Sequence, residues 1–208
     1  MQFVRPLLGA ATASVLFLSG CSLFPSGEPT PTATNTDAVP TPTETVDPGE
    51  GTFAVPSDCL SILPKSQADS YAAESIVLLA GPGGIYGGEL IPDPTPEMLE
   101  GGVSCYFGYD NDDPNQIQIY SVISAAPVTP ANRDSIIETL LSQGLNEGTN
   151  AAGHSTFSIL GDSDANVPAM FNVVSEDSWI SVISVFGGEA FFEENVAIAE
   201  LVRDQVYN

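Results

Sequence analysis

Alternating apolar and polar positions predict a pair of β-strands near the middle of the chain. In QIQIYSVIS (116–124), Ile117, Ile119 and Ile123 fall at spacings that place them on one face of a strand. The segment VSCYFGY (103–109) comes shortly before it, and the polar DNDDPN (110–115) lies between the two. We therefore expect these segments to form a hairpin.

Three further strands are predicted downstream by STFSIL (155–160), AMFNVV (169–174) and SWISVISVF (178–186). Glu176 and Asp177 mark the turn between the last two. Because consecutive strands with short connections usually pair antiparallel, all five strands are expected in one antiparallel sheet.

Helical spacing is clearest in TPANRDSIIETLLSQG (129–144). Thr129 can cap this helix, Pro130 suits its first position, and Gly144 suits the position after its end. Its apolar stripe is expected to consist of Ile136, Ile137, Leu140 and Leu141.

A second helix is predicted over EAFFEENVAIAELVRDQVY (189–207), whose apolar face comprises Phe192, Val196, Ala199, Val202 and Val206. Residues 60–79 predict one or two short helices around Pro64. Residues 81–102 predict a long Gly/Pro-rich loop with one helical turn after Pro96. The expected fold class is α+β, with an antiparallel sheet of about five strands and helices packed mainly on one face.

The N-terminus is typical of an exported protein. Arg5 precedes an apolar stretch from Pro6 to Leu18, about the length of a signal-peptide core and too short to span a bilayer. The tetrapeptide Leu18-Ser19-Gly20-Cys21 resembles the lipobox of bacterial lipoproteins. That resemblance implies cleavage before Cys21 and acylation of its sulfur, which would attach the chain to the outer side of the cell membrane. The alternative is an ordinary secretory signal with a chance cysteine.

Composition then divides the rest of the chain into two parts. The segment after Cys21 is dominated by proline, threonine and polar residues, so residues 21–55 are expected to be a lipidated, disordered tether. Residues 1–20 are expected to be the signal peptide. The aromatic and branched residues of the mature chain are concentrated in 56–208, which is expected to form one globular domain.

Charge narrows the possible partners. The chain has 27 acidic and 4 basic residues, and loss of Arg5 with the signal leaves 27 against 3, a net charge of −24. Binding of nucleic acid is not expected, since phosphate contacts require Lys and Arg. Electrostatic adhesion to anionic lipid is equally disfavoured, so membrane contact should depend on acylated Cys21. The acidity indicates either solubility alone or attraction for cations or a basic partner.

Two cysteines remain beside Cys21. Outside the cytoplasm Cys59 and Cys105 are expected to form a disulfide. Closing a loop of this length would contribute about 4 kcal/mol in the chain-entropy model. The alternatives are a free thiol pair or a metal site.

A cysteine before a short helix, then Gly-rich sequence, then a cysteine in SCYFGY resembles a group of actinobacterial envelope lipoprotein domains of unknown function. Relatives of that group include extracellular sensor domains of bacterial Ser/Thr kinases, and the PsbP/Mog1-like domains have a similar architecture. The resemblance implies an α+β domain outside the cell and supplies no catalytic motif.

Residues with potential chemistry are few. The single histidine, His154, lies in AAGHST without the motif of a nucleophile elbow. The loop GPGGIYGG (81–88) lacks the lysine of a phosphate-binding loop. Long loops often bind ligands, and Ile85 and Tyr86 at its tip are therefore candidate ligand contacts.

Two acidic segments are candidate Ca²⁺ sites, because carboxylate and amide oxygens are the ligands this ion prefers. They comprise Asp110, Asp112, Asp113 and Asn115 in the first segment and Asp162, Asp164 and Asn166 in the second. The second departs from the EF-hand pattern, with Val167 and Val173 where that loop has glycine and glutamate. Both segments are also typical of ordinary polar turns. No other cofactor is expected.

Together these features predict a membrane-anchored, extracytoplasmic, non-enzymatic module. It would bind or sense an envelope component, a small molecule or a protein partner through its loops and its exposed sheet face. Two alternatives stay open: a hydrolytic envelope enzyme that uses a pair of carboxylates, and a passive acidic module that binds Ca²⁺.

Overall fold

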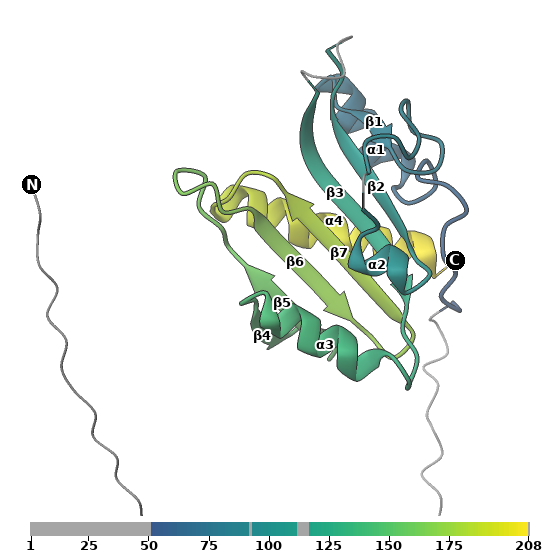
Figure 1. The fold of residues 1–208 in the computed structure, drawn as a ribbon, viewed down its shortest axis with the longest axis vertical. Coiled ribbons are helices and arrows are strands. Elements are labelled where there is room, and N and C mark those ends of the chain that lie inside the picture. The colour runs from purple at the N-terminus through teal and green to yellow at the C-terminus, as the bar shows by residue number, and fades with distance from the viewer. Residues whose placement is uncertain (1–50, 92, 112–116, 208) are drawn as a thin grey trace, which may run out of the picture. The chain divides into compact units, whose positions relative to one another are not determined.

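The computed structural model describes residues 51–91, 93–111 and 117–207 (Figure 1). The predicted signal peptide, Cys21 and the tether up to residue 50 lie outside these residues. Within the described part, no helix combines the length and the apolar character needed to cross a bilayer. The elements in chain order are α1 Lys65–Ala73, β1 Val77–Ala80, α2 Pro96–Leu99, β2 Val103–Tyr109, β3 Gln118–Pro127, α3 Arg133–Ser142, β4 Asn146–Thr149, β5 Ser155–Ile159, β6 Ala169–Val174, β7 Ser178–Ser184 and α4 Glu189–Val206.

All seven strands form one antiparallel sheet in the order β1-β2-β3-β7-β6-β5-β4. The α+β class, the antiparallel sheet and the β2–β3 hairpin are confirmed, whereas the expected count of about five strands is too low. The two additional strands, β1 and β4, are the edges of the sheet. Residues 77–79 fall at the end of the segment 60–79, for which one or two short helices were expected, and the four residues of β4 are exposed and show no apolar alternation.

Helices cover both faces of the sheet, which corrects the expectation that they pack mainly on one. Neighbouring residues of β7 point to opposite sides. Trp179 packs with Ile136 and Leu140 of α3, while Ile180 packs in the cluster that contains Ile198 and Val202 of α4. The structure therefore has two hydrophobic clusters, one on each face, rather than a single core.

The face that carries Trp179 also bears a row of apolar side chains across five strands. Tyr106, Val122, Ile183, Met170 and Ile159 occupy successive positions of the strand register. All five are only half-buried. This row continues the sheet beyond the cluster under α3.

The predicted helix after residue 129 is confirmed as α3, but its start differs. Asn132 is the N-cap residue, and its side-chain oxygen accepts hydrogen bonds from the backbone N–H and the hydroxyl of Thr129. Thr129 and Pro130 thus form the turn before the helix rather than its first residues. Gly144 follows the C-cap with φ of 81°, as expected for a residue that ends a helix in the left-handed region.

The C-terminal helix α4 is confirmed, but its buried face is rotated relative to the predicted stripe. Val196 is half-buried, whereas Asn195 is completely buried. Asn195 accepts a hydrogen bond from the Ser184 hydroxyl (2.7 Å) and donates one to the Ala169 carbonyl (2.9 Å). A polar side chain therefore fixes α4 to both β6 and β7.

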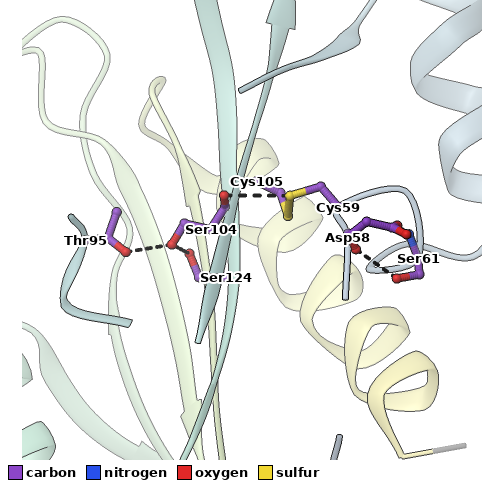
Figure 2. Close-up of a disulfide and its surroundings, with 7 residues drawn as sticks. All are labelled: Asp58, Cys59, Ser61, Thr95, Ser104, Cys105 and Ser124. Carbon is purple, nitrogen blue, oxygen red and sulfur yellow. Dashed lines mark hydrogen bonds between the residues drawn. A yellow bond between two sulfur atoms is a disulfide. The ribbon is translucent and has the colours of Figure 1, made fainter. Parts of the chain in front are cut away.

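The predicted disulfide between Cys59 and Cys105 is present and fully buried. Figure 2 shows Ser104 and Cys105 leaving β2 on opposite sides, Ser104 toward Thr95 and Ser124, and Cys105 toward Cys59. Gly81 passes so close that a Cβ atom there would lie 2.7 Å from the Cys59 sulfur and 2.6 Å from the Ser104 carbonyl oxygen. The Gly-rich segment thus begins with a glycine that the disulfide requires.

Candidate binding site: an aromatic cluster beside Glu194

Six aromatic rings from five different parts of the chain meet at one end of the sheet, on the face covered by α1 and α4. They are Tyr71, Phe107, Tyr109, Tyr120, Phe186 and Phe191, and we call them the aromatic cluster. The two strands of the predicted hairpin, the segment after β7 and two helices each contribute at least one ring.

Tyr120 is the centre of the aromatic cluster. Its ring centroid lies 5.9 Å from that of Tyr71 and 6.4 Å from those of Tyr109, Phe186 and Phe191. The interplanar angles range from 57° to 83°, so the rings meet edge to face or tilted, as aromatic pairs prefer. Each ring is therefore held by others before any ligand arrives.

A β-bulge places Tyr120 on this face. Phe107 pairs with Ser121 but Gly108 pairs with Ile119, so Tyr120 is the extra residue of β3. Consecutive residues of a regular strand point to opposite faces, yet Tyr120 and Ser121 both contact Tyr71. Bulges redirect side chains in this way and are frequent next to functional sites.

The aromatic cluster runs from the core to the surface. Tyr71 and Phe107 are buried, Tyr109, Tyr120 and Phe191 are half-buried, and Phe186 is 43% exposed. Phe186 packs against Phe191 with a centroid separation of 5.3 Å. A large ring that is supported from beneath and open to solvent is a ready contact surface.

A carboxylate lies next to the central ring. The Tyr120 hydroxyl donates a hydrogen bond to Oε2 of Glu194 at 2.7 Å. Burial of the ring, followed by this hydrogen bond and the negative charges of Glu194 and Glu74, raises the pKa of Tyr120 well above its ordinary value of 10.0. At neutral pH Tyr120 therefore remains a hydrogen-bond donor that orients Glu194.

A second acidic residue, Glu74 at the end of α1, lies near the aromatic cluster. It is close enough to Tyr71 and Tyr120 for its charge to raise the pKa of both. Glu194 and Glu74 therefore form a negatively charged rim beside the rings. Glu189 and Glu193 are exposed on the first turns of α4, but each stands two residues from Phe191 and so projects from the other side of the helix.

The basic side chains among the described residues have partners elsewhere. Lys65 pairs with Asp69 at 2.7 Å, Arg133 donates to the Ser175 carbonyl, and Arg203 lies over the ring of Tyr207. Glu194, Glu189 and Glu193 form no ion pair within the described part of the chain. The potential around the aromatic cluster is therefore negative.

The sequence-predicted loop contacts adopt different roles. Ile85 is 57% exposed, while Tyr86 is half-buried and its hydroxyl donates to Oδ1 of Asp110 at 2.8 Å. Backbone hydrogen bonds from Ile85 to Leu78 and from Tyr86 to Leu79 fold the loop back on β1. Asp110 follows Tyr109 directly, so the structure brings one predicted loop contact to the edge of the aromatic cluster.

The second candidate Ca²⁺ segment forms a closed turn. Oδ1 of Asp162 accepts hydrogen bonds from the backbone N–H groups of Asp164 and Ala165, and Asp162 bridges to Val167. Asn166 completes the turn with φ of 55°. Asp112, Asp113 and Asn115 of the first segment lie outside the described residues. Across 51–91, 93–111 and 117–207, no three His, Cys, Asp or Glu side chains are grouped as metal ligands.

The single histidine lies in a tight turn before β5. The backbone N–H of His154 donates to Oδ1 of Asn150, and its carbonyl accepts from the Asn150 N–H. Its Nδ1 is buried and makes no hydrogen bond within the described structure. Nothing in this arrangement presents the imidazole to a nucleophile.

Sequence reasoning missed the aromatic cluster because its members are scattered. The signals were short aromatic or acidic groups at the ends of elements, in FGY (107–109), VF (185–186) and FFEE (191–194), and none forms a contiguous motif. The bulge at Tyr120 has no sequence signature that single-residue alternation could reveal. Comparison with known proteins adds no assignment, since neither a protein-family model, a curated protein nor a solved structure matches this chain.

Proposed function

We propose that the chain is a membrane-anchored, extracytoplasmic lipoprotein whose folded part is a non-enzymatic binding module. Its ligand is an envelope component or a protein partner, and its binding surface is the exposed end of the aromatic cluster. The resemblance of Leu18-Ser19-Gly20-Cys21 to a lipobox supports the anchor. The observation that carries the binding surface is the exposed Phe186, packed on Phe191 and on the Tyr120 ring that Glu194 orients.

The place where the described part of the domain begins supports this assignment. The first described residues join the domain at the C-terminal end of α4, where Phe53 packs on Tyr207 at 5.8 Å and Ala54 donates to the Val206 carbonyl. Phe191 lies near the other end of α4, about 24 Å along the helix axis from Tyr207. The first described residues and the aromatic cluster therefore lie at opposite ends of α4.

The preorganisation of the aromatic cluster also supports the proposed binding surface. Binding is opposed by the conformational freedom that side chains lose when they become ordered. Rings that already contact one another have little of this freedom left to lose. Asn195 fixes the segment of α4 that carries Phe191 and Glu194 to the sheet, because its amide spans Ser184 and Ala169. Aromatic side chains presented on such a rigid base are typical of residues that dominate binding energy.

The test is capture of envelope components by the full acylated chain, compared between two serine variants of similarly exposed side chains. Phe186→Ser removes the exposed ring of the aromatic cluster, and Leu141→Ser removes a side chain that is 44% exposed on α3. We expect Phe186→Ser to lower recovery of the captured component about tenfold, as for loss of one central aromatic contact. Leu141→Ser should leave recovery unchanged.

Labelled palmitate provides the control for the anchor. It should enter the wild-type chain and both serine variants, and it should be lost in Cys21→Ala together with sedimentation on membranes. Equal recovery by the Phe186→Ser and Leu141→Ser chains would reject the aromatic cluster as the binding surface. Palmitate in the Cys21→Ala chain would reject the anchor.

A further inference from the structure

We propose that the partner of this surface is a basic polypeptide segment, whose Lys or Arg side chains lie across Phe186 and Tyr109 with their charged ends toward the surrounding carboxylates. This inference rests on the proposed function and names the chemistry of the ligand. It follows from the combination of exposed rings with a negative rim, and not from acidity alone.

The rings suit the stems of basic side chains. Lys and Arg place their methylene groups on apolar surface while the charged end stays in water. A cation within about 6 Å of an aromatic ring is further stabilised by about 0.5–1 kcal/mol at an exposed site. Phe186 is exposed and Tyr109 is half-exposed, so both can accept such contacts without rearrangement of the domain.

The carboxylates make this surface negatively charged. Glu194 is held beside the rings by Tyr120, and the charge of the exposed Glu74 acts on both Tyr71 and Tyr120. A carboxylate has room for several hydrogen bonds, and Glu194 accepts one from Tyr120. An incoming ammonium or guanidinium group can therefore pair with Glu194 without displacing the Tyr120 hydroxyl.

Other partners fit the same surface poorly. A second copy of the chain would bring its own carboxylates onto those of the first, since the sequence has 27 acidic and 4 basic residues. Anionic lipid and anionic polymers are repelled for the same reason. A basic segment is the partner whose charge complements both the rim and the whole domain.

The experiment measures binding of fluorescent hexalysine to the full acylated chain in neutral detergent, by fluorescence anisotropy at low salt. Two substitutions remove one exposed charge each. Glu74→Gln alters the residue of the rim that ends α1, and Glu138→Gln alters an exposed residue of α3. Hexaglutamate is the probe of opposite charge.

We expect Glu74→Gln and Phe186→Ser each to weaken hexalysine binding by about threefold, the size of the loss of one exposed charge contact or one cation–π contact. Glu138→Gln and Leu141→Ser should have no effect, and hexaglutamate should not bind. The two glutamine variants should keep the wild-type thermal midpoint, because both carboxylates are exposed, whereas the two serine variants should lower it by similar amounts, because each removes a side chain that is more than half buried.

Equal weakening by Glu74→Gln and Glu138→Gln would show diffuse attraction to an acidic protein and would overturn the proposal. So would hexalysine binding that is unaffected by Phe186→Ser, or no binding of hexalysine at all. In these cases capture from the envelope still tests the proposed function independently, because Phe186→Ser removes a ring and changes no charge. Capture that does not depend on Phe186, together with the expected hexalysine binding, would reject the proposed function instead.

Discussion

Reduction of the Cys59–Cys105 disulfide is expected to lower the free energy of unfolding of the domain by about 4 kcal/mol in the chain-entropy model, for a sequence separation of 46 residues. This is a large share of the 5–15 kcal/mol that roughly spans the stability of natural domains. The cross-link joins the segment before α1 to β2, near one edge of the sheet. The strand pairing that holds this edge is short, because β1 has only four residues.

The packing around the disulfide adds to the expected loss. Cys59 and Cys105 are completely buried, and Ile62 and Leu63 follow Cys59 into the same hydrophobic cluster. The backbone of Gly81 lies directly against the Cys59 sulfur and the Ser104 carbonyl oxygen. Position 81 therefore has no room for a side chain whose packing could replace the lost cross-link. Reduction should therefore loosen the segment from 56 to 64 before the rest of the domain unfolds.

Urea unfolding with and without a reductant measures this effect, and the double substitution Cys59→Ala with Cys105→Ala repeats it without a redox reagent. The reductant should have no effect on the double-alanine chain. A difference below about 1 kcal/mol between oxidised and reduced protein would contradict the expectation, because it would mean that the disulfide restricts the unfolded chain little.

Asn195→Ala is expected to lower the free energy of unfolding by about 3 kcal/mol, since it leaves two buried partners without a hydrogen bond. The Ser184 hydroxyl and the Ala169 carbonyl both bond to the Asn195 side chain, and all three residues are buried. Solvent cannot replace the lost bonds without opening the contact between α4 and the sheet. The change therefore acts on the same helix segment that carries Phe191 and Glu194.

Chemical unfolding of Asn195→Ala, Ser184→Ala and the double variant measures the coupling between the two side chains. The two single losses should not add, because both remove the same hydrogen bond. Glu200→Ala, an exposed position of α4, is the matched control and should change stability by less than about 0.5 kcal/mol. An Asn195→Ala chain as stable as Glu200→Ala would show that the amide does not hold α4 in place.

The sequence alone predicted a helix or strand correctly wherever a single residue pattern determined that element. Apolar and branched residues between turn signals located β2, β3, β5, β6 and β7, and helical spacing located α3 and α4. The finer expectation for β3 is wrong, because the bulge at Tyr120 places Ile119 and Ile123 on opposite faces. The expectation that the chain is exported made pairing of Cys59 with Cys105 the expected outcome, and the structure confirms the disulfide. These features depend on local periodicity or on chemistry, so tertiary contacts did not override them.

The remaining features depend on contacts between distant residues. β4 is a strand because β5 pairs with it, and its four exposed residues carry no apolar alternation. Asn195 is buried because Ser184 and Ala169 offer it partners, a fact that no helical stripe in the sequence can show. The aromatic cluster depends on both effects, since it needs the bulge at Tyr120 and the docking of α4.

The bulge links the fold to the proposed function most directly. Without it Tyr120 would point to the opposite face of the sheet, toward the row that contains Val122 and Ile183. With it, Tyr120 joins Phe186 and Phe191 and donates to Glu194. One additional residue in β3 thus converts two separate aromatic groups into one continuous surface next to a carboxylate.

The most direct test of this account is backbone-amide NMR of the full chain in detergent, titrated with hexalysine. We predict that the shifted amides concentrate at Tyr109, Tyr120, Phe186 and Phe191, with the first turns of α4. Shifts that concentrate instead on the opposite face, at Tyr106, Val122 and Ile183, or that spread evenly over every acidic segment, would contradict it.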